Sequence, residues 1–375
     1  MRTILALLGC SMSLSLVACG GSEDISLFPD TPPAKSGAGT GSDGNGFGED
    51  MQSGTNSACV SSVAEAALQP ANLVFMYDKS GSMGDPKTGF DPAKRWLPVN
   101  SGMRQFFTAA GSKSLNASLQ FFPSDGDLEA VCAYPYATPK VALSPLADSS
   151  PFLAAIDAET PSGGTPTVPA LQGAVTYAKQ IKTNRPGQNV AIVLVTDGEP
   201  GFWNDSSKSV EPGCSGNTVA EASSVAADAF AAGIPVHVIG VGPSLANLNA
   251  VASSGGTNAA QMIDVGDPGQ TTATFLSSLN AIRKQAVSCN FSIPPAPEGK
   301  QLDFNAVNVV LTDTNGKENV LYYSKDCSRA DGWHYDNAAA PTEILLCTNA
   351  CSTAQSAANA KVAVALGCKT QAQTK

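Results

Sequence analysis

Charged side chains and histidine are scarce in this sequence. Asp, Glu, Lys and Arg make up only 14% of its 375 residues, and 32 acidic residues against 22 basic ones give a formal net charge of −10. Since proteins bind the phosphates of nucleic acids with clustered Lys and Arg, this balance argues against a nucleic-acid partner. The two histidines, His237 and His334, are far apart, which excludes a His-rich zinc site and leaves oxygen or sulfur to hold any metal ion.

Long apolar runs are missing beyond residue 17. Residues 4–17 form one apolar run after Arg2, which is shorter than the roughly 20 residues that span a bilayer and typical of a signal-peptide core. The run ends at Leu16-Val17-Ala18-Cys19, which resembles the lipobox of bacterial lipoproteins. This resemblance implies a lipoprotein signal peptide over residues 1–18 and diacylation of Cys19. An ordinary signal peptide followed by a chance cysteine is the alternative.

Residues 20–58 are dominated by Gly, Ser, Asp, Pro and Thr. Such a segment buries too little apolar surface to offset the chain entropy lost on folding, so we interpret residues 19–58 as the lipidated cysteine and a flexible linker. We therefore expect the rest of the chain to be displayed outside the cytoplasm and to touch the membrane only through its lipid. The expected location is the cell envelope, at the outer membrane or surface of a Gram-negative bacterium.

Ten cysteines occur in the chain, two of them in the signal peptide and at the expected anchor. The others show no C-x-x-C metal spacing, and their even number in an exported protein favours up to four disulfides. The disulfide candidates are Cys59, Cys132, Cys214, Cys289, Cys327, Cys347, Cys351 and Cys368.

Between residues 70 and 288, short β-type runs alternate with longer segments of helical period. This alternation predicts an α/β domain with a doubly wound, mostly parallel sheet, which we place at residues 59–289. The continuous apolar runs 73–77 and 190–195 indicate inner strands that are covered on both faces. Further strands are expected at 236–241 and 261–265, and helices over 95–110, after Pro169, near 219–232 and 244–253, and over 271–287.

One antiparallel edge strand is expected in this sheet. Residues 119–122 and 131–142 have the composition of strands, and the polar turn 123–127 separates them. They are therefore expected to pair as a hairpin, with Cys132 at the start of its second strand.

Residues 290–375 differ in character, with several prolines followed by short alternating runs. We interpret this region as a small, disulfide-rich β domain, in which Asn315-Gly316 is a strong turn signal. Its strands are expected at 307–311, 320–323, 343–346 and 361–366.

Oxygen-bearing side chains follow two of the predicted inner strands. A D-x-S-x-S pattern, residues 78–82, comes directly after the first strand, and Asp197 follows the strand 190–195. Between them in the sequence lies the glycine-rich loop 163–167, just before a helix. Because ligands bind outside the carboxyl ends of parallel strands, we expect these segments to deliver carboxylates and hydroxyls to one edge. Any one segment taken alone is better explained as a helix cap or a turn.

The three segments together resemble the metal-ion-dependent adhesion site of von Willebrand factor type A domains, over about residues 70–288. The resemblance implies a Rossmann-like A domain, and Thr165 is a better match than Thr167 because the family's ligand follows directly on the glycines. The combination of lipobox, A domain and cysteine-rich tail is similar to surface lipoproteins of Gram-negative, particularly myxobacterial, bacteria. The ligands that the resemblance implies are Asp78, Ser80, Ser82, Thr165 and Asp197.

These residue types agree with the implied chemistry. Mg²⁺ is a small, hard cation that prefers oxygen ligands and keeps some of its water. The carboxylates of Asp78 and Asp197 would neutralise its double charge, while the neutral hydroxyls add ligands and leave one position open. In the family, an acidic side chain of a partner protein completes that position. We therefore expect Mg²⁺, with Mn²⁺ or Ca²⁺ as alternatives, and a protein partner that presents a carboxylate.

The connection 199–218 is unusually long for a link between a strand and a helix. Long loops at such an edge commonly bind partners, and a Cys132–Cys214 disulfide would restrain this one. We also expect a Cys59–Cys289 disulfide to close the opposite end of the domain, with the last four cysteines pairing among themselves.

These features predict a non-enzymatic adhesion or protein-binding module that works through Mg²⁺. Two alternatives stay open: a metal-dependent hydrolase, for which Glu199 is the nearest candidate base, and a structural envelope protein whose site never bridges to a partner. His237 alternates with apolar residues in a predicted inner strand, which favours a role in the core.

Overall fold

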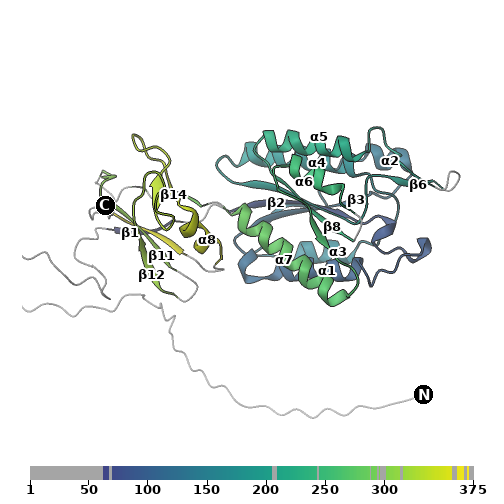
Figure 1. Cartoon of the computed structure of the whole chain (residues 1–375), viewed down its shortest axis with the longest axis horizontal. Helices are drawn as coiled ribbons and strands as arrows, with labels where there is room; N and C mark the ends of the chain where they lie inside the picture. The colour runs from purple at the N-terminus through teal and green to yellow at the C-terminus, as the bar shows by residue number, and fades with distance from the viewer. Residues whose placement is uncertain are drawn as a thin grey trace, which may run out of the picture. The chain divides into compact units, whose positions relative to one another are not determined.

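The computed structural model describes residues 62–66, 70–204, 209–242, 245–287, 289–293, 295, 301–312, 316–356, 361–366 and 370. The expected signal peptide, Cys19 and linker lie outside these ranges. The described residues form an α/β part and a β-rich part (Figure 1). Within them, no helix combines the length and the apolar character needed to cross a membrane.

A six-stranded sheet is the centre of the α/β part. All neighbouring strands are parallel except the first, which is antiparallel at the edge. Every residue of the next four strands is buried, which explains their continuous apolar runs and confirms the predicted fold class. In spatial order the strands are β4 (Val141–Pro145), β3 (Asn116–Phe122), β2 (Asn72–Asp78), β5 (Val190–Thr196), β8 (Val236–Val241) and β9 (Gln261–Ile263).

Helices cover both faces of this sheet (Figure 1). Successive residues of a strand point to opposite faces, so β2 contributes Phe75 and Tyr77 to one core and Val74 and Met76 to the other. The first core is shared with α1 (Trp96–Thr108), α3 (Ser150–Asp157) and α7 (Pro268–Ala286). The second is shared with α4 (Thr167–Asn184), α5 (Val219–Ala231) and α6 (Leu248–Ser254).

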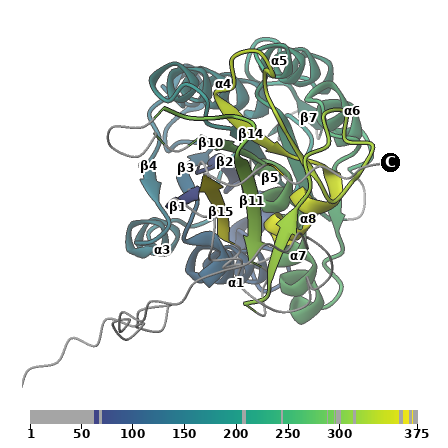
Figure 2. The same cartoon turned by 90° about the vertical axis from the view of Figure 1, so that its left-hand side faces the viewer.

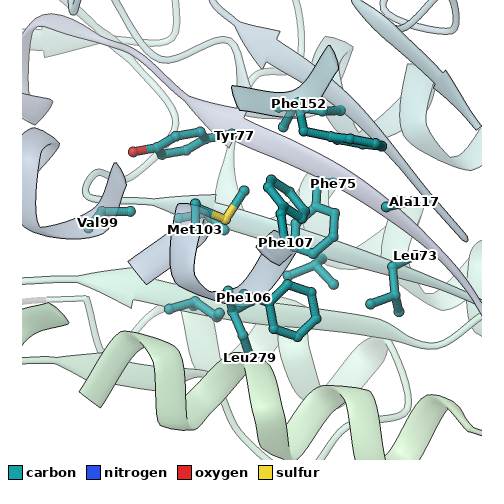
Figure 3. Close-up of a cluster of buried hydrophobic side chains, with 14 of the residues drawn as sticks. Leu73, Phe75, Tyr77, Val99, Met103, Phe106, Phe107, Ala117, Phe152 and Leu279 are labelled. Carbon is teal, nitrogen blue, oxygen red and sulfur yellow. The ribbon is translucent and has the colours of Figure 1, made fainter. Parts of the chain in front are cut away.

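Aromatic residues fill the core between β2 and α1 (Figure 3). Phe75 makes edge-to-face contacts with Phe106 and Phe107, with ring centroids 6.0 and 5.3 Å apart. Closer to the end of β2, Tyr77 stacks on Trp96 at a centroid distance of 5.1 Å. These contacts hold the start of α1 against the end of β2, beside the loop that carries the first candidate ligands.

The expected hairpin after β3 is wrong in its second strand. Residues Leu128–Ala133 form a helix, α2, in which the Asp127 carboxylate accepts a hydrogen bond from the Ala130 amide at 2.9 Å. The strand β4 begins only at Val141, so Cys132 lies on a helix. A short apolar run fits a strand and a helix equally well, and here the helix cap decides between them.

Two antiparallel sheets and the helix α8 (Thr348–Ser356) make up the β-rich part. The four strands predicted there are present, those at 343–346 and 361–366 with the predicted bounds and the other two with shifted ends. Three further strands and the helix were not predicted. One sheet has the order β1 (Ser62–Ala66), β15 (Lys361–Leu366), β11 (Val307–Thr312) and β12 (Glu318–Leu321). The other has the order β10 (Asn290–Ser292), β14 (Glu343–Leu346) and β13 (Trp333–Tyr335).

Strand β1 belongs to the β-rich part, although its residues were assigned to the α/β domain from the sequence. It pairs antiparallel with β15, with Ala64 opposite Val364, and β15 pairs in turn with β11 (Figure 2). The α/β part is therefore inserted between two strands of the β-rich part, β1 and β10. A short strand pattern does not identify its partner, because the pairing is made with residues at the other end of the chain.

Three disulfides lie within the described residues: Cys132–Cys214, Cys289–Cys351 and Cys327–Cys347. The first is the predicted bond. Because Cys289 bonds to Cys351, the expected Cys59–Cys289 bond is wrong, and so is the pairing of the last four cysteines among themselves. Cys289 follows the end of α7, where the chain enters the β-rich part again, and Cys351 lies on α8 of that part. Cys59 and Cys368 lie outside the described residues.

Candidate metal centre

The first segment of the site is the turn that follows β2. The Asp78 carboxylate accepts a hydrogen bond from the Ser80 amide, with Oδ1 and N 2.6 Å apart. This turn brings the hydroxyl oxygens of Ser80 and Ser82 to 3.1 Å from each other. Between them, the Gly81 amide donates to the Gly163 carbonyl at 2.9 Å, which holds the first segment against the glycine-rich loop.

The segment at the end of β5 contacts the first through two hydroxyls. β2 and β5 are parallel neighbours, so their carboxyl ends lie side by side. Thr196 Oγ1 donates to Asp78 Oδ2 at 2.6 Å, and Ser82 Oγ donates to Asp197 Oδ1 at 2.8 Å. The two carboxylates, which are far apart in the sequence, therefore share one hydrogen-bonded network.

Thr165 lies in the remaining segment, the loop before α4. Its amide donates to the Gly201 carbonyl at 2.7 Å, and the Gly201 amide donates to the Thr165 carbonyl at 3.1 Å. A Cβ atom placed on Gly198 would lie 3.6 Å from Thr165 Oγ1 and 3.9 Å from Ser82 Oγ, so both hydroxyls border the same space. The structure thus brings all five residues of the sequence pattern to one edge of the sheet.

The two carboxylates are buried close together. Asp78 is fully buried, and the Asp197 side chain has no exposed surface. Burial and then the charge of Asp197 raise the pKa of Asp78 to about 7, although hydrogen bonds from Thr196 and Ser80 lower it. Burial also raises the pKa of Asp197, although the charge of Arg95 lowers it. A divalent cation between these groups would stabilise the ionised form of both.

The donor set suits a hard cation. Among the described residues, no three His, Cys, Asp or Glu side chains are grouped so that they could hold a metal ion, so a site here must use hydroxyl oxygens as well. The five side chains supply two carboxylates and three hydroxyls, which are oxygen ligands of the kind that Mg²⁺, Mn²⁺ and Ca²⁺ accept. The residues present therefore fit a divalent cation of this class.

Residues 73–199 match the sequence model of a known family, the von Willebrand factor type A domain. This range begins in β2 and ends just after Asp197, so it includes all five candidate ligands. The chain contains a von Willebrand factor type A domain. No curated protein sequence matches the chain.

Several solved structures resemble the chain at low sequence identity. The pilus adhesin SpaC from Lactobacillus rhamnosus GG has 17% identity and a TM-score of 0.44, over 80% of this chain and 40% of that chain. The von Willebrand factor domain of the type V pili tip protein Mfa5 from Porphyromonas gingivalis has 16% identity and a TM-score of 0.39, over 64% and 100%. The manganese-loaded TRAP protein of Plasmodium vivax has 17% identity and a TM-score of 0.39, over 64% and 93%. The chain spans less than half the length of the SpaC structure.

Arg95 is a member of the A-domain site that the sequence pattern does not reveal. It directly precedes α1, and its Nη1 donates to Asp197 Oδ2 at 2.6 Å and to the Ser82 carbonyl at 2.9 Å. A single arginine before a helix carries no signal in the sequence, because its partners are brought to it only when the A domain folds.

Lys79, the second residue of the D-x-S-x-S pattern, anchors the turn through ion pairs. It is buried, and its Nζ lies 2.9 Å from Asp125 Oδ1 and 2.8 Å from Glu159 Oε2. Lys140 contacts the other oxygen of Glu159 at 2.7 Å. These ion pairs tie the first segment of the site to the chain after β3 and after α3.

The long connection 199–218 forms a hairpin beside Thr165. Its strands β6 (Phe202–Asn204) and β7 (Ser209–Glu211) are antiparallel. A Cβ atom on Gly164 would lie only 2.2 Å from the Phe202 ring, so a glycine is required for the hairpin to pack on this loop of the A domain. As predicted, the Cys132–Cys214 disulfide restrains the connection, here by joining it to α2.

Glu199 and His237 stand outside this chemistry. Glu199 is exposed and accepts a hydrogen bond from Asn247 Nδ2 at 2.7 Å, so none of its described contacts favours it as the base of a hydrolase. His237 is buried in β8, and burial lowers its pKa to about 4, which leaves it neutral near pH 7. Its predicted role in the core is confirmed.

Proposed function

We propose that this protein is a cation-dependent adhesion or protein-binding module. The observation that carries the proposal is the hydrogen bond from Ser82 to Asp197, at 2.8 Å, which joins two separate segments of the A domain at one buried edge. Such a site would hold Mg²⁺, or Mn²⁺ or Ca²⁺ in its place, and would bind an acidic side chain of a partner protein through the ion. The residues that hold the cation are Asp78, Ser80, Ser82, Thr165 and Asp197.

The residues of this chain perform separate tasks at the edge. Asp78 and Asp197 supply the negative charge that retains a divalent cation, and their burial limits screening of that charge by water. The three hydroxyl oxygens are ligands that add no charge. The two carboxylates alone would then balance the charge of a divalent cation, which leaves no excess negative charge to repel an incoming acidic side chain. A bound Mg²⁺ would supply the electrophilic position that the partner carboxylate fills.

A non-enzymatic role follows from the same contacts. Glu199, the nearest candidate base, is exposed and bonded to Asn247. We therefore assign the site a binding role without a catalytic step. The assignment would be contradicted if the wild type turned over a substrate and Glu199→Gln lost that turnover while still binding the cation.

Measuring the water on a bound Mn²⁺ tests the proposal without knowledge of the partner. Mn²⁺ bound to the purified protein should enhance the relaxation of water protons, and acetate, as a model carboxylate, should reduce that enhancement by displacing water from the open position. Asp197→Asn should abolish Mn²⁺ binding, whereas Asp228→Asn, an exposed control on α5, should not. The proposal would be refuted if the wild-type protein bound no Mn²⁺, or if acetate did not change the relaxation enhancement.

A structural envelope protein is distinguished by its response to chelation. Partners captured by the A domain through the cation should be released by EDTA and fail to bind Asp197→Asn. Capture that survives both treatments would favour a structural role.

We further propose that diacylated Cys19 anchors the protein in the bacterial cell envelope and displays the A domain there. The composition of residues 16–19 and of the segment after them supports this location. Metabolic labelling with a fatty-acid analogue should mark the wild-type protein, and Cys19→Ser should lose both the label and the membrane association. A Cys19→Ser protein that keeps its label would contradict the anchor.

A further inference from the structure

A guanidinium group of the protein already neutralises one of the two carboxylates of the site. Arg95 Nη1 lies 2.6 Å from Asp197 Oδ2, and the same nitrogen donates to the Ser82 carbonyl at 2.9 Å. The Asp197 side chain has no exposed surface and that of Arg95 is 22% exposed, so this ion pair is largely shielded from water. Such a pair interacts more strongly than one on the surface.

The surroundings of Arg95 hold its guanidinium in this position. Its Cζ lies 5.6 Å from the centre of the Phe90 ring, which places the cation over an aromatic face. On another side it packs against Gly242, at the end of β8, where a Cβ atom would lie 3.6 Å from Nη2. Gly242 has a φ of +139°, a conformation that other residues rarely adopt. Residues from separate parts of the sequence therefore surround the guanidinium.

Both oxygens of Asp197 are engaged in this arrangement. Oδ1 accepts from the Ser82 hydroxyl at 2.8 Å, and Oδ2 accepts from Arg95. A divalent cation that coordinated Asp197 would therefore share this carboxylate with the positive guanidinium of Arg95. Two like charges held by one carboxylate repel each other strongly in a site with little water.

We propose that Arg95 is a tethered counter-cation that neutralises Asp197 in the cation-free protein and opposes the binding of a divalent cation. The inference rests on the proposed function, because it concerns the same site and assumes that this site takes such a cation. Filling of the site is then an exchange in which a divalent ion takes over the neutralisation of Asp197 from Arg95. The site becomes adhesive only when the concentration of free divalent cation is high enough to replace Arg95 as the counter-charge of Asp197.

Calorimetric titration of the full-length protein with Mg²⁺ tests the exchange. Arg95→Gln removes the competing charge and should bind Mg²⁺ roughly tenfold more tightly or better, the change that about 1.4 kcal/mol produces. Arg95→Lys keeps the charge and should stay within about threefold of the wild type, less than half of that change. Arg104→Gln is the matched control, because Arg104 lies on α1, the helix that Arg95 directly precedes, and pairs with Asp157 on the surface; it should bind Mg²⁺ like the wild type.

Thermal unfolding supplies a second measurement that does not depend on adhesion. In EDTA, Arg95→Gln should unfold at a lower temperature than the wild type, since Asp197 has lost its counter-charge. At saturating Mg²⁺ the difference should shrink or reverse, because the more tightly bound ion stabilises the variant more.

The outcomes separate this inference from the proposed function. If the wild type binds Mg²⁺ and Arg95→Gln binds it equally or more weakly, Arg95 orients Asp197 for the ion and the exchange is refuted. Tighter binding in Arg95→Lys as well as in Arg95→Gln would also refute it, because the charge would not be the cause. If neither the wild type nor Arg95→Gln binds Mg²⁺ or Mn²⁺, the proposed function itself fails and removes the basis of the exchange.

Discussion

Replacing Asp78 with asparagine should stabilise the cation-free protein and at the same time destroy its cation site. The change leaves the shape of the side chain almost intact. The asparagine oxygen keeps the hydrogen bond from the Ser80 amide, and the new amide group donates to Thr196 Oγ1. The Thr196 hydroxyl then gives its hydrogen to the Gly198 carbonyl, which already lies 3.1 Å away. The network survives with one bond reversed, and only the charge is lost.

The size of the effect follows from the pKa of Asp78. Burial and the charge of Asp197 raise this pKa from its ordinary value of 3.8 to about 7. The folded protein therefore holds the proton more tightly than the unfolded chain. The contribution of Asp78 to the free energy of unfolding is highest below pH 3.8, falls as the pH rises and levels off above about 7. One pKa unit corresponds to about 1.4 kcal/mol, so the wild type loses up to about 4 kcal/mol over this interval. Because asparagine has no charge to bury, the free energy of unfolding of Asp78→Asn should exceed that of the wild type by about 2–4 kcal/mol at pH 8.

Urea unfolding in EDTA at several pH values between about 5 and 8 measures both quantities. The wild type should lose stability over this range, and Asp78→Asn should lose much less. Mg²⁺ should then stabilise the wild type and leave Asp78→Asn unchanged, while the exposed control Asp228→Asn should follow the wild type in both respects. An Asp78→Asn variant that is less stable than the wild type in EDTA at pH 8 would refute the reasoning.

Three further changes test other parts of the molecule. Replacing Cys132 and Cys214 with serine should lower the free energy of unfolding in urea by about 2–4 kcal/mol, because the unfolded chain regains freedom; unchanged stability would show that the bond does not restrain the connection. Gly164→Val should displace the Phe202 ring and weaken Mg²⁺ binding, measured by calorimetry, by about tenfold, and Phe202→Ala in the same chain should restore part of it. At position 237, His237→Phe should remove a loss of stability of up to about 3 kcal/mol that the wild type shows in unfolding experiments as the pH falls from about 6.5 to 4; the sign follows from the lowered pKa of this buried histidine.

The inner strands of the sheet could be predicted because burial on both faces gives their sequences a simple pattern. β2 and β5 are covered on both faces, so their sequences are continuous apolar runs that no surface strand would have. The presence of one antiparallel edge strand was predicted correctly, but its position in the sequence was wrong. Residues 131–133 fit a strand or a turn of helix, and the Asp127 cap that makes them helical is a single side-chain contact.

The five candidate ligands could likewise be found from the sequence, since each follows a recognisable element: a strand, a glycine-rich loop or the end of a second strand. The Cys132–Cys214 bond was also predicted, although the sequence placed Cys132 on a strand and the structure places it on α2. Cys289 was misassigned because its partner, Cys351, is on a helix of the β-rich part whose position the sequence does not show.

The sequence alone determined which segments become buried strands and where the chain presents carboxylates and hydroxyls at strand ends, and residues 73–199 match the model of the von Willebrand factor type A domain. These properties depend on neighbours along the chain, which the order of residues shows directly. Only the tertiary structure decided that Arg95 reaches Asp197 and that β1 pairs with β15. Both are contacts between residues far apart in the sequence, and such contacts are selected by packing and strand register after the elements have formed.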